Sequence, residues 1–185
     1  MRGARRWGAV CAAAVLAAAG ASTAAAAATS AHSATPARAS GIAKCTAADL
    51  GVWVAADQSD GTAGSIYYPL EITNLSSSTC YLYGHPGVSA VTGAGHQLGQ
   101  SARWNPGTAR VVNLAPGGTA HAMLQYVTVQ VAPGCSPANA AELKVIPPDQ
   151  TSSASAFWDL PSCSTGPVYL AVGVVQPGPG TRDST

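Results

Sequence analysis

Short runs of residues with β character, divided by glycine, proline, asparagine and serine, fill the chain between positions 45 and 176. In the run over 66–73, apolar residues alternate with residues such as Glu71 and Thr73, which we expect to face water. Helical periodicity is nearly absent, and this spacing is typical of an antiparallel β-sandwich of about seven to nine short strands. The expected strands cover 50–54, 66–73, 80–83, 88–92, 109–114, 120–131, 141–146, 156–160 and 168–176.

The first 28 residues have the three parts of a secretory signal peptide. Arg2, Arg5 and Arg6 form a basic start, an uncharged apolar run follows over 8–20, and small residues then offer cleavage sites between Ala24 and Ala28. A retained membrane anchor is the alternative, but the apolar run is well short of the ~20 residues needed to span a bilayer. We therefore expect a secreted, extracellular product with no stable membrane anchor.

The stretches that flank the β-rich region have a different composition. Residues 29–44 are small, polar and unpatterned, and too poor in apolar surface to fold, so we expect a flexible leader there. Residues 177–185 begin with alternating proline and glycine, and we expect a disordered tail. The predicted folded domain is therefore 45–176.

Removal of the signal peptide reverses the sign of the net charge. The whole chain has 9 basic and 8 acidic residues, and loss of the three arginines at its start leaves 6 basic against 8 acidic. A mildly acidic surface gives no electrostatic reason to bind nucleic acid or anionic lipid, both of which favour clustered lysine and arginine. We expect a monomer that binds neither.

Four cysteines remain after the signal peptide, which contains Cys11, is removed: Cys45, Cys80, Cys135 and Cys163. An even number in an exported chain indicates two disulfides, for which three pairings are possible. We favour Cys45–Cys80 with Cys135–Cys163, because each bond then joins neighbouring segments. Each would stabilise the fold by roughly 3.5–4 kcal/mol on the chain-entropy model. A zinc site is the alternative, but the close C-x-x-C spacing of such sites is absent.

Several turn residues carry their own structural expectations. Pro69 cannot donate to a ladder, so its strand should be an edge strand or bulged at that point. Asn74, at the end of the same strand, can hydrogen-bond the backbone of the following turn. Gly87 and Gly117 each follow a proline, which is typical of the positive-φ position of a type II turn.

In order and spacing, these segments resemble a family of secreted proteins, the domain of unknown function numbered 4232, which is widespread in actinobacterial extracellular proteins and lipoproteins. The resemblance covers roughly residues 45–176 and implies an export signal and an immunoglobulin-like β-sandwich, with no established activity. His85 stands where family members more often have an aromatic residue, usually tyrosine. The segments are Gly61-Thr62-Ala63-Gly64, Tyr67-Tyr68-Pro69-Leu70-Glu71-Ile72-Thr73-Asn74, Thr79-Cys80, Gly84-His85-Pro86-Gly87-Val88, Leu98-Gly99, Leu114-Ala115-Pro116-Gly117-Gly118-Thr119-Ala120 and Leu143-Lys144-Val145-Ile146-Pro147-Pro148.

Motifs for catalysis are absent from the sequence. The mature cysteines are expected to be oxidised, and no G-x-S-x-G elbow is present. His85, His96 and His121 would support a hydrolase only if two of them converged with a serine or aspartate. We therefore expect no enzyme and no cofactor, with a hydrolase of unrecognised type as an open alternative.

A copper site is the sharper chemical alternative. His121 and Met123 are two residues apart on a predicted strand and therefore on one face, and imidazole and thioether are ligands that copper accepts. The other reading places His121 on an exposed strand face with Met123 packed beside it. We favour that reading, because a lone H-x-M pair is a weak signal and the cysteine that a blue-copper site requires is not free.

Exposed tryptophan is the best candidate for ligand binding, because a flat aromatic face packs well against apolar faces of sugars or proteins. Trp104 lies in a stretch rich in turn residues, and we expect it to be exposed, whereas Trp53 and Trp158 lie in predicted strands and should pack in the core. The sequence thus favours a non-catalytic module that binds an extracellular protein or glycan, with Trp104 in the binding surface.

Overall fold

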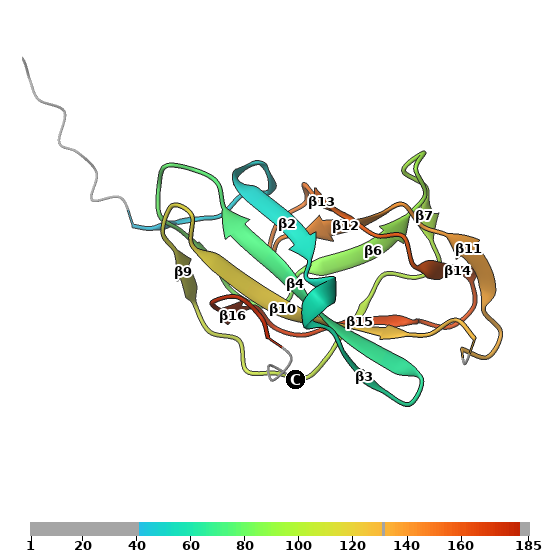
Figure 1. Cartoon of the computed structure of the whole chain (residues 1–185). Helices are drawn as coiled ribbons and strands as arrows, with labels where there is room; N and C mark the ends of the chain where they lie inside the picture. Colours follow the sequence, from blue (N-terminus) through green and yellow to red (C-terminus); the bar gives the residue numbers. More distant parts are fainter. Residues whose placement is uncertain (1–40, 131, 182–185) are drawn as a thin grey trace, which may run out of the picture. The chain divides into compact units, whose positions relative to one another are not determined.

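The computed structural model describes residues 41–130 and 132–181 (Figure 1). The predicted signal peptide, residues 29–40 of the leader and the last four residues lie outside this part. The strands are β1 (Ala43–Lys44), β2 (Leu50–Val54), β3 (Asp60–Thr62), β4 (Ser65–Asn74), β5 (Cys80–Leu82), β6 (Gly87–Val91), β7 (Gln97–Leu98), β8 (Arg103–Trp104), β9 (Val112–Leu114), β10 (Thr119–Val127), β11 (Ser136–Asn139), β12 (Glu142–Ile146), β13 (Ala154–Phe157), β14 (Pro161–Thr165), β15 (Leu170–Val172) and β16 (Gln176–Pro177). The described helices are two 3-10 turns, Ala47–Asp49 and Ala56–Gln58.

Two sheets face each other as the predicted sandwich. One has the order β2-β4-β10-β15-β8, and the other has the order β13-β12-β6-β7 (Figure 1). In the first sheet, neighbouring strands β2, β4 and β10 correspond to strands A, B and E of an immunoglobulin-like domain. In the second sheet, β13, β12 and β6 correspond to strands G, F and C. The all-β, immunoglobulin-like prediction is confirmed.

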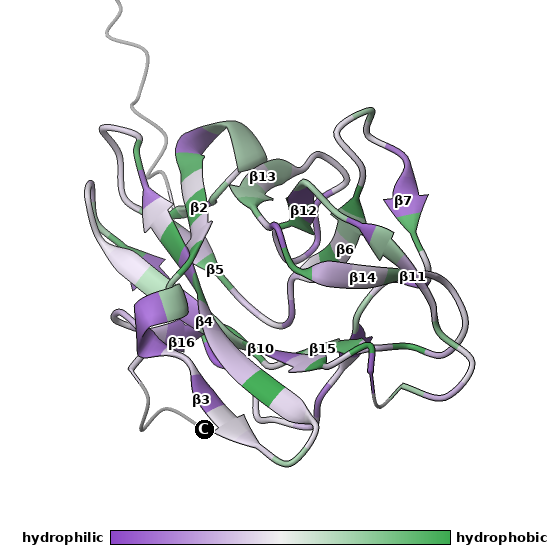
Figure 2. Ribbon diagram, turned by 45° about the vertical axis from the view of Figure 1, so that its right-hand side comes forward, coloured by the Kyte–Doolittle hydropathy of each residue, from purple (hydrophilic) through white to green (hydrophobic). Residues whose placement is uncertain are grey.

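The main core fills the space between these sheets. Tyr68 and Leu70 from β4 and Leu124 from β10 point inward to meet Leu143 from β12 and Trp158, which follows β13, and all five are buried. Inward and outward residues alternate along each strand, which is why green and pale segments alternate in Figure 2. Since each fully buried large apolar side chain contributes about 1.5–3 kcal/mol, this layer is the main source of stability.

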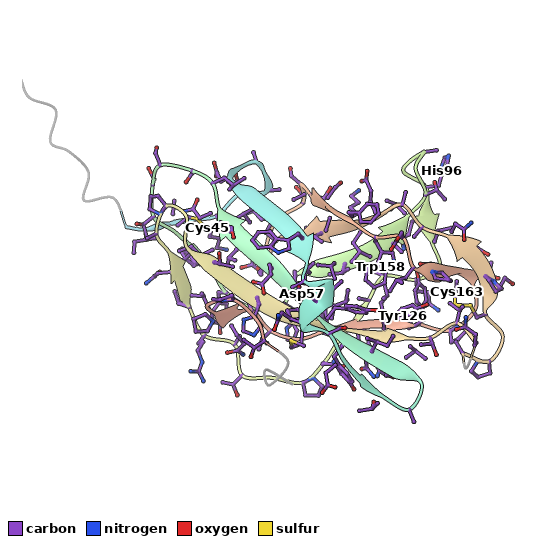
Figure 3. All side chains as sticks on the ribbon, in the orientation of Figure 1. Cys45, Asp57, His96, Tyr126, Trp158 and Cys163 are labelled. Atoms are coloured by element: carbon purple, nitrogen blue, oxygen red, sulfur yellow. A yellow bond between two sulfur atoms is a disulfide. The ribbon has the colours of Figure 1, made fainter. Side chains whose placement is uncertain are left out.

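A second, smaller core lies at the end of the sandwich that β1, β5 and β9 cover. Cys45 and Cys80 form a disulfide within it, and Cys135 and Cys163 form the other disulfide. Figure 3 labels Cys45 and Cys163 at opposite ends of the sandwich. The predicted pairing is confirmed, and each bond closes one end of the domain.

The strand count is larger than the seven to nine predicted. The described residues form 16 strands, because loops between the main strands pair locally over two to five residues, as in β7 and β11. Two of these short pairings, β1 with β5 and β8 with β15, are parallel, so the sheets are not purely antiparallel. In both pairs the two strands are distant in the sequence. The period-two pattern of the main strands therefore does not predict these pairings.

The folded domain extends past both predicted boundaries. At the start, Ala43 and Lys44 pair with β5, although they belong to the predicted leader. At the end, β16 pairs with β10, and Gly178 and Gly180 donate backbone hydrogen bonds to the domain. The prediction of a disordered tail from residue 177 is therefore wrong for residues 177–180, because backbone pairing holds a segment whose composition suggested a linker.

Two of the turn predictions hold, one holds in part and one needs correction. The Asn74 side chain is fully buried and bonds the following turn, and Gly117 has a φ of 75°. Pro69 is not on an edge strand, since β4 has β10 on one side and β2 and β3 on the other. The predicted irregularity is nevertheless present, because the pairing with β2 ends at Leu70 and the pairing with β3 begins at Tyr67. Gly87 begins β6 without a positive φ, and Gly84 takes that conformation instead, with a φ of 110°.

Across residues 41–130 and 132–181, no helix is long and apolar enough to cross a membrane.

Candidate functional site

An open groove of about 460 Å³ lies where the loop after β5, the short strand β8 and the turn after β12 meet. The first wall includes Tyr83, His85 and Trp104, and the opposite wall runs from Ile146 to Gln150. Its size is within the ~300–1,000 Å³ typical of small-ligand sites. Three segments that are far apart in the sequence therefore build one hollow.

His85 and Trp104 form a rigid aromatic unit in this groove. Their rings are stacked, with centroids 5.2 Å apart and planes 14° from parallel. The Trp104 indole Nε1 donates to the Pro86 carbonyl at 3.3 Å, and His85 Nε2 donates to the Asn105 carbonyl at 2.8 Å. Trp104 is nevertheless 65 % exposed. Its position is fixed while much of its surface stays open to solvent, the arrangement that favours binding with little loss of entropy.

The short strand β8 explains why Trp104 is held so well. The sequence predicts an exposed loop at this position, but Arg103 and Trp104 pair with Ala171 and Val172 of β15, and the Asn105 amide donates to the Val172 carbonyl.

Asp149, on the opposite rim, has unusual backbone geometry. Its φ is 57°, and among the described residues it is the one non-glycine with a positive φ. The Gln150 amide donates to the Pro147 carbonyl and closes a turn around it. Asp149 Oδ2 accepts from Lys44 Nζ at 2.8 Å, which raises the pKa of Lys44. Strained backbone of this kind is concentrated at functional sites, because the surrounding structure must hold it in place.

A second hollow of about 380 Å³ lies beyond the loop 105–108. Tyr67 and Met123 line it from the outer face of the sheet, and Val174 and Gln176 line its other side. A Cβ on Gly107 would come within 3.0 Å of Val174 Cγ2, so this loop is packed closely against the end of the sheet. The loop thus separates two hollows, of which the first carries the stacked aromatic pair.

The residues of the copper alternative are placed differently from the expectation. His121 is buried, and its Nδ1 donates to the Gly178 carbonyl at 2.9 Å, while Met123 lines the second hollow. The prediction that His121 lies on an exposed face is wrong, because the segment 176–180 covers that face. In the described part of the chain, no three residues from histidine, cysteine, aspartate and glutamate gather as a metal site.

Glu71 is a buried acid that the sequence pattern places in water. It is 3 % exposed, and its Oε1 accepts from the Gly180 amide at 2.7 Å, whereas its buried Oε2 has no hydrogen-bond partner among the described residues. Burial raises the pKa of this carboxyl, and the Gly180 hydrogen bond and the nearby His121 partly oppose the rise. Alternation along β4 correctly puts Glu71 on the outer face, but it carries no signal that another segment covers that face.

The three histidines considered for hydrolysis lie in separate settings. His96 lies exposed in the β6–β7 turn (Figure 3). His85 belongs to the groove, and His121 is buried on β10. No described contact brings two of them together with a serine or an aspartate. Among the described residues, the histidines therefore do not form the convergent set that the hydrolase alternative requires.

The remaining tryptophans divide unevenly. Trp158 is buried as predicted and meets Tyr68 and Tyr126 edge to face. Trp53 is 44 % exposed, so the expectation that it packs in the core is wrong. It lies opposite Glu71 on the outward face of the sheet, where only part of its ring is covered.

Comparison with known protein families gives a match over most of the chain. The domain of unknown function DUF4232 matches residues 45–179. The chain belongs to the DUF4232 family. No curated protein and no solved structure matches it. The family match ends at residue 179, so residues 176–179 of the segment that covers His121 lie within it, and Gly180 lies just outside.

Proposed function

We propose that this DUF4232 protein is exported and acts as a non-catalytic module that binds an extracellular protein or glycan in the groove around Trp104. The observation that carries the proposal is the rigid, exposed pair of His85 and Trp104. A large side chain held in place by a stack and a hydrogen bond, yet 65 % exposed, has no structural reason to face water. Surface aromatics of this kind are the usual energetic centres of binding sites.

Export is supported by two separate features. The N-terminal 28 residues have the composition of a signal peptide, and both disulfides join cysteines beyond it. Disulfides persist mainly in oxidising compartments. Mass spectrometry of the culture medium tests this directly: we expect a product that begins near residues 25–29 and contains no free thiol. A product found only inside the cell, with its first residues intact, would contradict export.

The binding proposal is tested with the producing cell's own envelope. The exported protein is immobilised and incubated with solubilised envelope material, in parallel with Trp104→Ala and Trp53→Ala variants. Trp53 is the matched control because it is also a partly exposed tryptophan but lies on β2, outside the groove. We expect a retained protein or glycan that is lost with Trp104→Ala and kept with Trp53→Ala. Equal retention by all three proteins would rule out this groove.

A further inference from the structure

We infer that the groove recognises a glycan built of uncharged sugar rings, with a ring packed on the Trp104 side and its hydroxyls bound at the Asp149 rim. The inference rests on the proposed function and assigns the chemical class of its ligand. A sugar ring presents C–H groups on its faces and hydroxyls around its edge. It therefore needs a flat apolar surface and a rim of hydrogen-bonding groups side by side.

The apolar surface is supplied by the first wall of the groove. Trp104 and Tyr83 are 65 % and 49 % exposed, and the His85 ring stacks against the Trp104 ring. The Trp104 ring cannot easily turn away, because its Nε1 is held by the Pro86 carbonyl. Such a platform loses little conformational freedom when a ligand packs on it.

The hydrogen-bonding rim is supplied by the opposite wall. Asp149 uses Oδ2 for Lys44, and its Oδ1 has no partner among the described residues. The Gln150 side-chain amide likewise makes no hydrogen bond within the described chain, and it lines the same groove. A carboxylate oxygen accepts from hydroxyls, and an amide both accepts and donates, so the two together match a pair of neighbouring sugar hydroxyls. Asp149 holds this position although its positive φ would suit glycine better.

The charges at the rim favour an uncharged ligand. Lys44 Nζ lies 2.8 Å from Asp149 Oδ2, so the acid and the base at the rim offset each other. An anionic polymer would be repelled by the Asp149 carboxylate, and no cluster of basic residues at the rim would compensate. A cationic one would have to compete with Lys44 for Asp149.

A proline-rich peptide is the competing occupant of an aromatic groove. Grooves for such peptides dock extended segments against aromatic rings that retain a donor for a peptide carbonyl. Here the indole donor of Trp104 is already used by Pro86, and the His85 Nε2 donor is used by Asn105. The groups that make no hydrogen bond within the described chain are Asp149 Oδ1, the Gln150 side-chain amide and the Tyr83 hydroxyl, which together offer both acceptors and donors, as neighbouring sugar hydroxyls require.

The test is a binding panel for the exported full-length protein. The probes are short soluble oligomers of glucose, mannose, galactose and N-acetylglucosamine, together with dextran sulfate and a synthetic proline-rich peptide. Affinity is measured by calorimetry, and Trp fluorescence reports contact with the ring. We expect one or more of the uncharged oligomers to bind, and Trp104→Ala to weaken that binding about tenfold or more. Trp53→Ala should leave it unchanged.

The rim has its own variant. Asp149→Asn keeps a residue that tolerates positive φ but loses the acceptor charge, so it should weaken the same oligomer while the thermal midpoint stays close to that of the wild type. Binding of the peptide or of dextran sulfate alone, lost with Trp104→Ala, would overturn the glycan assignment and leave the proposed groove intact. Uncharged oligomers that bind equally well to the Trp104→Ala protein would overturn the site as well. If no probe of the panel binds but an envelope protein is captured in a Trp104-dependent way, the glycan assignment is overturned and the proposed groove stands.

Discussion

Glu71 on β4 and His121 on β10 lie directly opposite each other in the ladder, and both hydrogen-bond the same C-terminal segment. Glu71 accepts from Gly180, and His121 donates to Gly178. The last strand is thus fastened by a buried acid and its cross-strand neighbour, in addition to two ladder residues.

The first prediction concerns the effect of pH on stability. Burial raises the pKa of Glu71, so between the unfolded value of about 4.3 and the higher folded value the folded state holds a proton that the unfolded state has lost. This contribution to the free energy of unfolding is complete below the unfolded pKa and is lost as pH rises through the folded pKa. Urea unfolding of the wild type and of Glu71→Gln across this range measures the difference between them. As pH rises, the Glu71→Gln variant should gain unfolding free energy relative to the wild type. A difference in unfolding free energy that does not change with pH would contradict a raised pKa of Glu71.

The second prediction concerns Gly180. A Cβ at this position would lie 2.5 Å from Pro69 Cβ and 3.1 Å from the His121 ring. Gly180→Ala must therefore displace the C-terminal segment, and we expect it to cost about 1–3 kcal/mol of unfolding free energy. Gly61→Ala is the control, since its nearest atom would lie 3.9 Å away, and a change within about 0.5 kcal/mol is expected. Equal effects of the two substitutions in denaturant unfolding would show that the close packing at Gly180 has been misread.

The third prediction concerns Asn74, which is fully buried where β4 ends. Its Nδ2 donates to the carbonyls of Ser78 and Leu114, and its Oδ1 accepts from Ser76. Asn74→Ala leaves several buried groups without partners, each costing about 1–3 kcal/mol, so a total loss of about 3 kcal/mol or more is expected in thermal or urea unfolding. Asn113→Ala, at an exposed position of β9, should change stability little.

The fourth prediction concerns the disulfides, which close loops of similar length. Their cysteines are 35 and 28 positions apart, so the chain-entropy model gives each bond about 3.6–3.8 kcal/mol. Replacing either pair by alanine should therefore lower the free energy of unfolding by a comparable amount. Binding should respond differently, because only Cys45 and Cys80 adjoin groove segments. If the Cys135 and Cys163 variant lost binding while still folded, the local role of the first bond would be in doubt.

The sandwich could be predicted from the sequence because each main strand carries its own period-two pattern of apolar residues. Leu70 and Leu124 point inward as alternation requires, and of the three possible cysteine pairings the favoured one, which joins neighbours along the chain, is the one observed. Alternation within one strand cannot predict that a distant segment of the chain covers its outer face. Glu71 and His121 read as exposed because the segment over them consists of glycine and proline, which have no hydrophobic pattern.

The groove was predicted only in part, for the same reason. Trp104 stood out because large aromatic residues are conspicuous among turn residues. His85 lies 19 positions before Trp104 and Asp149 lies 45 positions after it, and only folding brings them together. The left-handed backbone of Asp149 leaves no mark in the sequence, since aspartate is also an ordinary surface residue.

The bond between Cys45 and Cys80 holds more than an end of the core. Lys44, which pairs with Asp149 at the rim, directly precedes one of these cysteines, and Tyr83 of the aromatic wall follows closely after the other. One disulfide thus links the segment that carries Lys44 to the segment that carries Tyr83. On the proposed function, we therefore expect the chain with this bond reduced to bind its ligand more weakly than the oxidised chain.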